Sequence, residues 1–134
     1  MSERDYSGTP LPKKLGIREG SRLFVAGAPD GFLETLGPDA ALLPEPRGPL
    51  DVILFFTASR DELEARFTEL DRELAPAGGL WVAYPKKASG VPTDLTFQDV
   101  QEIGLAAGLV DNKSCAIDGV WSGARFVIRL KDRR

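Results

Sequence analysis

The chain has 134 residues, of which 43% are hydrophobic, which is the size and composition of one globular domain and excludes a disordered chain. Its formal net charge of −3 argues against a dedicated nucleic-acid-binding protein, because such proteins usually carry a strong basic excess. One cysteine and no histidine exclude an intrachain disulfide and any Ser–His or Cys–His nucleophile pair, and leave too few donors for a structural zinc site.

The start of the chain is polar and rich in glycine and proline. We expect a loosely ordered segment over residues 1–15, with at most a short helical turn within 11–17, followed by a single domain over residues 16–134. The first residues lack the apolar stretch of a signal peptide, and no apolar run approaches the roughly 18–20 residues that span a bilayer. The sequence therefore predicts a cytoplasmic protein that has no contact with a membrane.

The first strand is predicted over residues 21–26, a short and mostly apolar run that ends at Gly27. Asp30 is placed to cap a short helix over residues 31–36. A weak second strand is expected over residues 40–43.

Residues 51–56 give the clearest strand signal. Five consecutive apolar residues follow Asp51, which indicates burial on both faces, as in a central parallel strand. We expect Asp51 itself to accept backbone hydrogen bonds from a neighbouring loop. Ser59 and Glu62 form a capping-box pattern, and apolar residues at helical spacing over 63–74 predict the helix that follows.

Another buried strand is predicted over residues 80–84, followed by a loop over 85–92. Thr96 with Asp99 repeats the capping-box pattern at the start of a second helix, which ends at Gly108.

The last part of the chain changes period. A short strand is expected over residues 115–117, then a turn over 118–123. We expect Trp121 in this turn to cover the end of the sheet, and the alternative is an exposed ring that anchors a partner. Alternating apolar and polar residues over 124–130 predict an antiparallel strand at or near the edge of the sheet. A free edge strand allows pairing with a second copy, so a homo-oligomer is one expected arrangement.

Strand–helix–strand units with buried strands predict an α/β fold. The expected architecture is a Rossmann-like three-layer sandwich, with a mostly parallel sheet that ends in an antiparallel C-terminal hairpin. Residues 16–130 resemble a truncated class I S-adenosylmethionine-dependent methyltransferase. The resemblance rests on the glycine turn at 20–31, the central strand at 51–56, the Pro-x-Gly-Gly stretch within 74–84 and the two-strand ending after Gly108.

This resemblance implies S-adenosylmethionine as the candidate cofactor. It places Gly27 and Gly31 in the turn that the cofactor approaches, and Glu45 at its ribose hydroxyls. The chain departs from the family in several ways: the turn has two glycines instead of three, and Pro29 removes a backbone donor. Only about two dozen residues separate the first strand from Asp51, where the family places two strands.

A second resemblance covers nearly the whole chain. Residues 85–95 (PKKASGVPTDL), together with 7–11 and 108–113, are similar to a bacterial family of short proteins catalogued as a domain of unknown function. This family implies a shared fold and no assigned activity.

The loop after the strand at 80–84 is the candidate ligand site in its own right. Lys86 and Lys87 supply two cations, and Ser89 and Thr93 supply two hydroxyls, a set that suits a phosphate or carboxylate. The competing interpretation is that the lysines are solvated and the hydroxyls shape turns.

Three functions stay open from the sequence. The first is a non-catalytic domain that binds a small anionic ligand or a protein partner on a methyltransferase-like fold. The second is a methyltransferase that acts on an unknown acceptor. The third is an anion- or nucleotide-binding regulatory domain that uses the 85–94 loop. Nucleic acid is not an expected partner.

Overall fold

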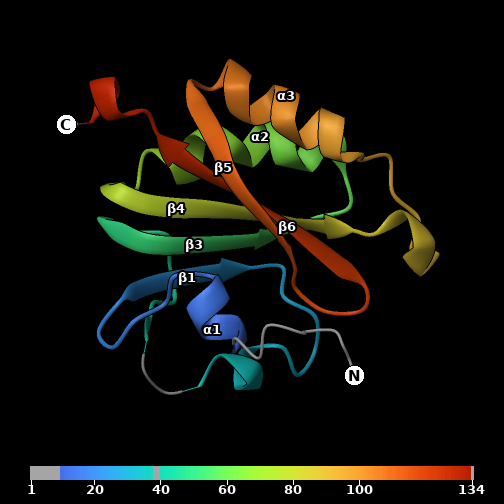
Figure 1. The fold of residues 1–134 in the computed structure, drawn as a ribbon, viewed down its shortest axis with the longest axis horizontal. Coiled ribbons are helices and arrows are strands. Elements are labelled where there is room, and N and C mark those ends of the chain that lie inside the picture. Colours follow the sequence, from blue (N-terminus) through green and yellow to red (C-terminus); the bar gives the residue numbers. More distant parts are fainter. Residues whose placement is uncertain (1–9, 38–39, 134) are drawn as a thin grey trace.

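The computed structural model describes residues 10–37 and 40–133 (Figure 1). Its sheet has six strands in the order β2-β1-β3-β4-β6-β5. The strands are β1 (Arg22–Ala26), β2 (Ala41–Leu42), β3 (Leu50–Phe56), β4 (Leu74–Pro85), β5 (Leu109–Ala116) and β6 (Trp121–Ile128). The helices are α1 (Leu11–Lys14), α2 (Arg60–Asp71) and α3 (Phe97–Ala106), with three 3₁₀ helices, η1 (Leu33–Leu36), η2 (Lys87–Ser89) and η3 (Leu130–Asp132).

The sheet is mostly parallel, as the sequence predicts. Strands β2, β1, β3 and β4 pair in parallel, whereas β6 is antiparallel to both of its neighbours, β4 and β5. The expected α/β fold with an antiparallel C-terminal hairpin is therefore confirmed.

Helices α2 and α3 lie together on one face of the sheet (Figure 1). Leu63 and Phe67 of α2 and Val100 of α3 are fully buried against this face. The ring of Phe67 meets that of Phe126 from β6 edge to face, with centroids 5.6 Å apart. This face holds the larger of the two hydrophobic clusters, which explains the strict apolar spacing along α2.

The other face is covered by α1 and η1, which are much shorter. Leu15 and Ile17 are buried there, and the indole nitrogen of Trp81 donates a hydrogen bond to the Leu15 carbonyl over 3.0 Å. The folded domain therefore includes residues 10–15, which we expected to be part of a loose segment. Residues 1–9 lie outside the described part of the chain.

The helix starts follow the capping patterns with one difference. The Thr96–Asp99 capping box of α3 is complete. At α2, the Ser59 hydroxyl accepts the Glu62 backbone N–H over 3.2 Å, but the Glu62 carboxylate accepts the hydroxyl of Thr57 instead of reaching back to the Ser59 backbone. Near β1, η1 has no side-chain cap, so the predicted cap at Asp30 is wrong.

The C-terminal hairpin is longer than predicted and starts earlier. Strand β5 spans Leu109–Ala116, whereas we expected only 115–117, and β6 includes Trp121, which we placed in the turn. Because β6 lies between β4 and β5, the edge strand on this side of the sheet is β5. No helix in the described part of the chain is long and apolar enough to cross a membrane.

Candidate functional site

The parallel strands β1, β3 and β4 end on the same side of the sheet, which we call its carboxyl end. Chain order reverses between β1 and β3, because β1 pairs with β2 on one side and with β3 on the other. In open α/β sheets, ligands bind at such a reversal, outside the carboxyl ends of the strands. The residues around the turn after β1 are therefore the first candidates for a ligand site.

Gly27 occupies the turn after β1 in a left-handed conformation, with φ of 72°. A Cβ atom at this position would lie only 2.5 Å from the backbone oxygen of Phe56 in β3. The turn therefore needs glycine because it packs directly against the neighbouring strand. Gly31 is also left-handed, with φ of 81°, but the nearest atom to its missing Cβ is a Glu34 carboxylate oxygen 3.8 Å away.

A row of aromatic side chains lies beside this turn. The rings of Phe32 and Phe56 meet edge to face with centroids 4.8 Å apart, and Phe56 meets Trp121 in the same way at 5.2 Å. Phe32 is 5% exposed and Phe56 is 3% exposed. The row joins the turn after β1, the end of β3 and the start of β6, so the chain's own rings fill this part of the reversal.

Polar groups at the end of β3 are also engaged. The Thr57 side chain is buried, and its hydroxyl donates to the Glu62 carboxylate while it accepts the Ser59 backbone N–H over 3.2 Å. The single O–H donor of this hydroxyl is thus used in a hydrogen bond to the chain's own carboxylate. It serves the start of α2 and is not free to orient a ligand.

Glu45 does not join the glycine turn. The Arg47 backbone N–H donates to the Glu45 carbonyl over 2.8 Å, and the Arg22 side chain at the start of β1 holds the carbonyls of Arg47 and Pro49. These bonds turn the chain back toward the start of β3. The Glu45 side chain is 70% exposed and pairs with Arg47 at 4.0 Å, so it faces solvent instead of a ribose site.

The loop after β4 keeps its cations but uses its hydroxyls internally. The Ser89 hydroxyl donates to the Lys86 carbonyl over 2.6 Å, and the Thr93 hydroxyl donates to the Ala58 carbonyl over 2.7 Å. Both hydroxyls also accept a backbone N–H, from Val91 and Leu95 respectively. Lys87 is exposed and Lys86 is half-buried. Of the four candidate residues in this loop, only the two lysines can offer protons to an anion.

A cavity of about 380 Å³, which sequence analysis missed, lies between the end of β4 and the β5–β6 hairpin. It is lined by Tyr84, Phe97, Ser114 and Ser122, among others. Burial raises the pKa of the Tyr84 phenol above its usual range, so the phenol stays protonated at neutral pH. The position of Tyr84 at the carboxyl end of a buried strand was the only signal in the sequence.

The donor set for a metal is also absent from the described residues. Within 10–37 and 40–133, no three cysteine or acidic side chains lie close enough together to hold a metal ion.

Solved structures share this fold over most of both chains. A S-adenosylmethionine-dependent methyltransferase from Aquifex aeolicus superposes with a TM-score of 0.66 at 15% identity, covering 87% of this chain and 87% of its own. A TehB-like methyltransferase from Corynebacterium glutamicum gives 0.60 at 14% identity, covering 93% and 92%. Fibrillarin from Aeropyrum pernix with bound S-adenosylmethionine gives 0.58 at 13% identity, covering 89% and 69%.

The fold is that of a class I methyltransferase. At these identities the likeness concerns the fold alone, and function has to be argued from the site. No family model matches the chain, and no curated protein matches it, so the resemblance to the bacterial family of short proteins stays a prediction.

The residues present do not fit S-adenosylmethionine in the way that the resemblance implies. Gly27 closes on the backbone of Phe56, Glu45 faces solvent, and the Thr57 hydroxyl is bound to Glu62.

Proposed function

We propose that this chain is a non-catalytic binding domain on a methyltransferase-like fold. The observation that carries the proposal is the aromatic row of Phe32, Phe56 and Trp121, which packs beside the carboxyl ends of β1 and β3, the end of the sheet where open α/β folds bind ligands. Because these rings pack against one another, their apolar surfaces are buried without a bound ligand.

The chemistry of the neighbouring side chains supports the same conclusion. Methyl transfer to a protonated acceptor is accelerated by a group that takes up the acceptor's proton near pH 7. The sequence has no histidine, the Thr57 hydroxyl is hydrogen-bonded to Glu62, and burial raises the pKa of Tyr84. None of these groups is suited to act as a general base.

The loop after β4 offers the surface through which such a domain would meet a charged partner. Lys86 and Lys87 have no carboxylate within 4.0 Å among the residues that the structure describes. An acidic peptide or a small anion would find two unpaired ammonium groups there. These groups give affinity more than geometric selectivity, because lysine is a point charge with rotatable donors.

Calorimetric titration with S-adenosylmethionine and S-adenosylhomocysteine tests the proposal. We expect no measurable heat of binding for either compound at concentrations up to roughly 1 mM, which corresponds to less than about 4 kcal/mol of binding free energy. Micromolar binding would contradict the proposal if it also depends on the glycine turn.

Two matched variants, Gly31→Asp and Gly90→Asp, test whether binding of the cofactor depends on the glycine turn. Both glycines are left-handed, with φ of 81° and 78°, and neither has a close neighbour that a side chain would strike. Aspartate tolerates this conformation better than most residues. Binding that is lost in Gly31→Asp and kept in Gly90→Asp would place the cofactor at the turn.

A second function, methyl transfer from S-adenosylmethionine to an unknown acceptor, is favoured by one observation. A cavity of about 300 Å³ beside β1 and β2 is lined by the apolar residues Val25, Leu33, Leu42, Leu43 and Pro44. An apolar hollow next to a left-handed glycine turn is suited to the flat face of an adenine ring. The titration above separates the two functions, since only the methyltransferase requires the cofactor to bind.

A further inference from the structure

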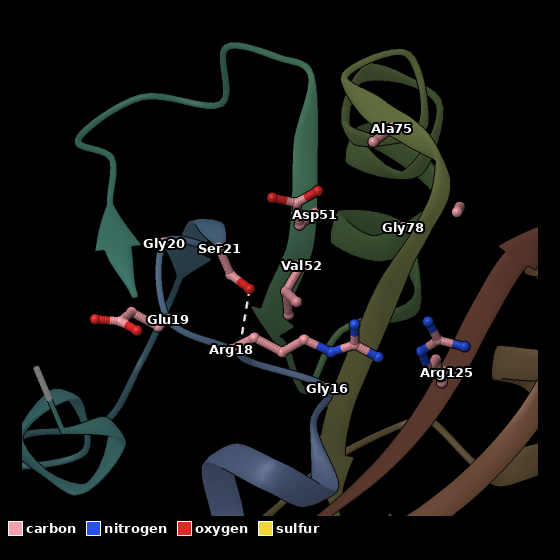
Figure 2. A pocket seen from close by; sticks show the side chains of 11 residues that line it. Gly16, Arg18, Glu19, Gly20, Ser21, Asp51, Val52, Ala75, Gly78 and Arg125 are labelled. Atoms are coloured by element: carbon pink, nitrogen blue, oxygen red, sulfur yellow. Dashed lines mark hydrogen bonds between the residues drawn. The ribbon is translucent and has the colours of Figure 1, made fainter. Parts of the chain in front are cut away.

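A third cavity lies at the opposite end of the sheet, where β1, β3 and β4 begin (Figure 2). Its volume is about 460 Å³, which is in the range of small-molecule sites. Among the residues that line it are Arg18, Ser21, Asp51, Gly78 and Arg125. This amino end of the sheet is far from the strand ends that bind cofactors in this fold.

Two arginines dominate the cavity. Both line it from different parts of the chain, and Figure 2 shows the Arg18 side chain extending toward the side of the cavity where Arg125 of β6 lies. Neither guanidinium has a carboxylate within 4.0 Å in the described chain. An anion bound between them would meet two positively charged donor groups that no carboxylate of the described chain pairs.

The acidic residues of the same cavity do not neutralise the arginines. Asp51 uses its carboxylate to accept the Arg22 backbone N–H over 2.9 Å, which confirms the role expected for it. The Glu19 side chain points away from both guanidinium groups in Figure 2. Asp51 and Glu19 keep their negative charges, so an anion has to bind on the side of the cavity where the two guanidinium groups lie.

The Arg125 side chain is held in place by two features of the backbone. It lies across Gly79, where a Cβ atom would overlap the guanidinium group. Its Nη1 donates to the Asn112 side-chain oxygen over 3.3 Å, and the pairing of β5 with β6 shifts register between Asp111 and Lys113, which makes Asn112 the extra residue of a bulge. Bulges of this kind often re-aim a side chain beside a site.

Burial and the nearby charge of Arg133 lower the pKa of Arg125 from its usual range, which is the effect expected for a cation that lacks an anionic partner.

A hydroxyl completes the donor set. Ser21 is buried, and its Oγ accepts the Arg18 backbone N–H over 2.9 Å. Among the described residues, no acceptor takes the proton of this hydroxyl. The cavity thus brings together two guanidinium forks and one free O–H donor.

We propose that this cavity binds a small molecule with a compact, doubly charged oxyanion group, a phosphate monoester or a pair of carboxylates, between Arg18 and Arg125. Guanidinium groups recognise phosphate and carboxylate oxygens through paired hydrogen bonds, and two of them match two negative charges. The site is independent of the function proposed above, because it shares no residue with the carboxyl end of the sheet.

Calorimetric titration with inorganic phosphate and with malonate tests the site. We expect the wild-type chain to bind at least one of these anions, and Arg18→Gln to weaken that binding by about tenfold or more, because the variant removes a charged donor. Arg47→Gln is the matched control: it also removes one positive charge, from a side chain that is 81% exposed and does not line the cavity. The control should bind as the wild type does.

Arg18→Gln is expected to fold normally, since no described side chain or backbone group bonds to the Arg18 guanidinium. Arg125→Gln gives a second reading on the same site and should also weaken binding. A preference for phosphate identifies the ligand as a phosphate monoester, and a preference for malonate identifies a dicarboxylate. If neither anion binds, or if Arg18→Gln and Arg47→Gln bind equally well, the proposed site is wrong.

Discussion

Replacing Gly27 by alanine tests whether the glycine turn serves packing. Alanine at this position carries two penalties. The left-handed conformation costs an L-residue roughly 1–2 kcal/mol. The new Cβ would lie 2.5 Å from the Phe56 backbone oxygen, and relieving such a contact by shifting the backbone costs roughly 1–3 kcal/mol. We therefore expect Gly27→Ala to lower the free energy of unfolding by about 2–5 kcal/mol.

Gly31→Ala is the control within the same turn. Its φ of 81° brings the same conformational penalty, but its Cβ would meet only a Glu34 oxygen at an ordinary contact distance of 3.8 Å. The expected loss is roughly 1–2 kcal/mol. The difference between the two variants, roughly 1–3 kcal/mol, isolates the contact between the turn and β3.

Urea unfolding, monitored by tryptophan fluorescence, measures the stability of both variants. Trp81 is fully buried in the core and reports its loss. Because a small domain loses roughly 1–3 kcal/mol of stability per molar urea, the midpoint of Gly27→Ala should fall about 1 M below that of Gly31→Ala. Equal midpoints would refute the reasoning, since they would mean that the contact of the new Cβ with the Phe56 backbone adds no cost to that of the left-handed conformation.

Two further predictions concern the helices. Gly104 of α3 packs so closely against the Phe126 ring that a Cβ atom would overlap it. Although alanine favours helices, we expect Gly104→Ala to lower the free energy of unfolding, measured in urea, by roughly 1–3 kcal/mol. A variant more stable than the wild type would show that the ring can move aside. Hydrogen bonds from Thr96 and the charge of Arg60 lower the pKa of Asp99, so its contribution to stability is present above the usual aspartate pKa of about 4 and is lost as the pH falls below it. The stability advantage of wild type over Asp99→Asn should be constant above about pH 5 and shrink as the pH falls below about 4, and an advantage that is constant throughout would contradict this assignment.

The sequence predicts the centre of this fold well because local and tertiary preferences agree there. Strand β3 is buried on both sides, so its apolar run leaves no alternative to a central strand. The start of α3 is equally clear, because Thr96 and Asp99 satisfy each other within one turn.

The hairpin was harder to predict because β5 is an edge strand. Its middle is polar and exposed, and the bulge at Asn112 breaks the alternation that marks a strand. Backbone pairing with β6 defines β5, and that pairing leaves no pattern in the sequence of β5 itself.

The sites show a different limit. Glu62 has the spacing of a capping box, yet the nearby Thr57 hydroxyl competes for its carboxylate, and sequence spacing does not rank the two partners. Arg18 and Arg125 lie in distant parts of the chain, and only the pairing of β6 with β4 brings them to one cavity. Neither arginine has a motif that would have marked it as a ligand-binding residue.

Glycines have opposite roles at the two ends of this sheet. At the carboxyl end, Gly27 lets the backbone close on Phe56, whose ring packs against Phe32. At the amino end, Gly79 makes room for the guanidinium of Arg125, which would otherwise be displaced from the cavity. A glycine turn after the first strand thus indicates a cofactor site only when the space beside the glycine is open. The fold by itself suggests a site at that turn in either case. In this chain, two arginines without a carboxylate partner lie at the end of the sheet that the fold does not point to, so a search for a ligand should include Arg18 and Arg125.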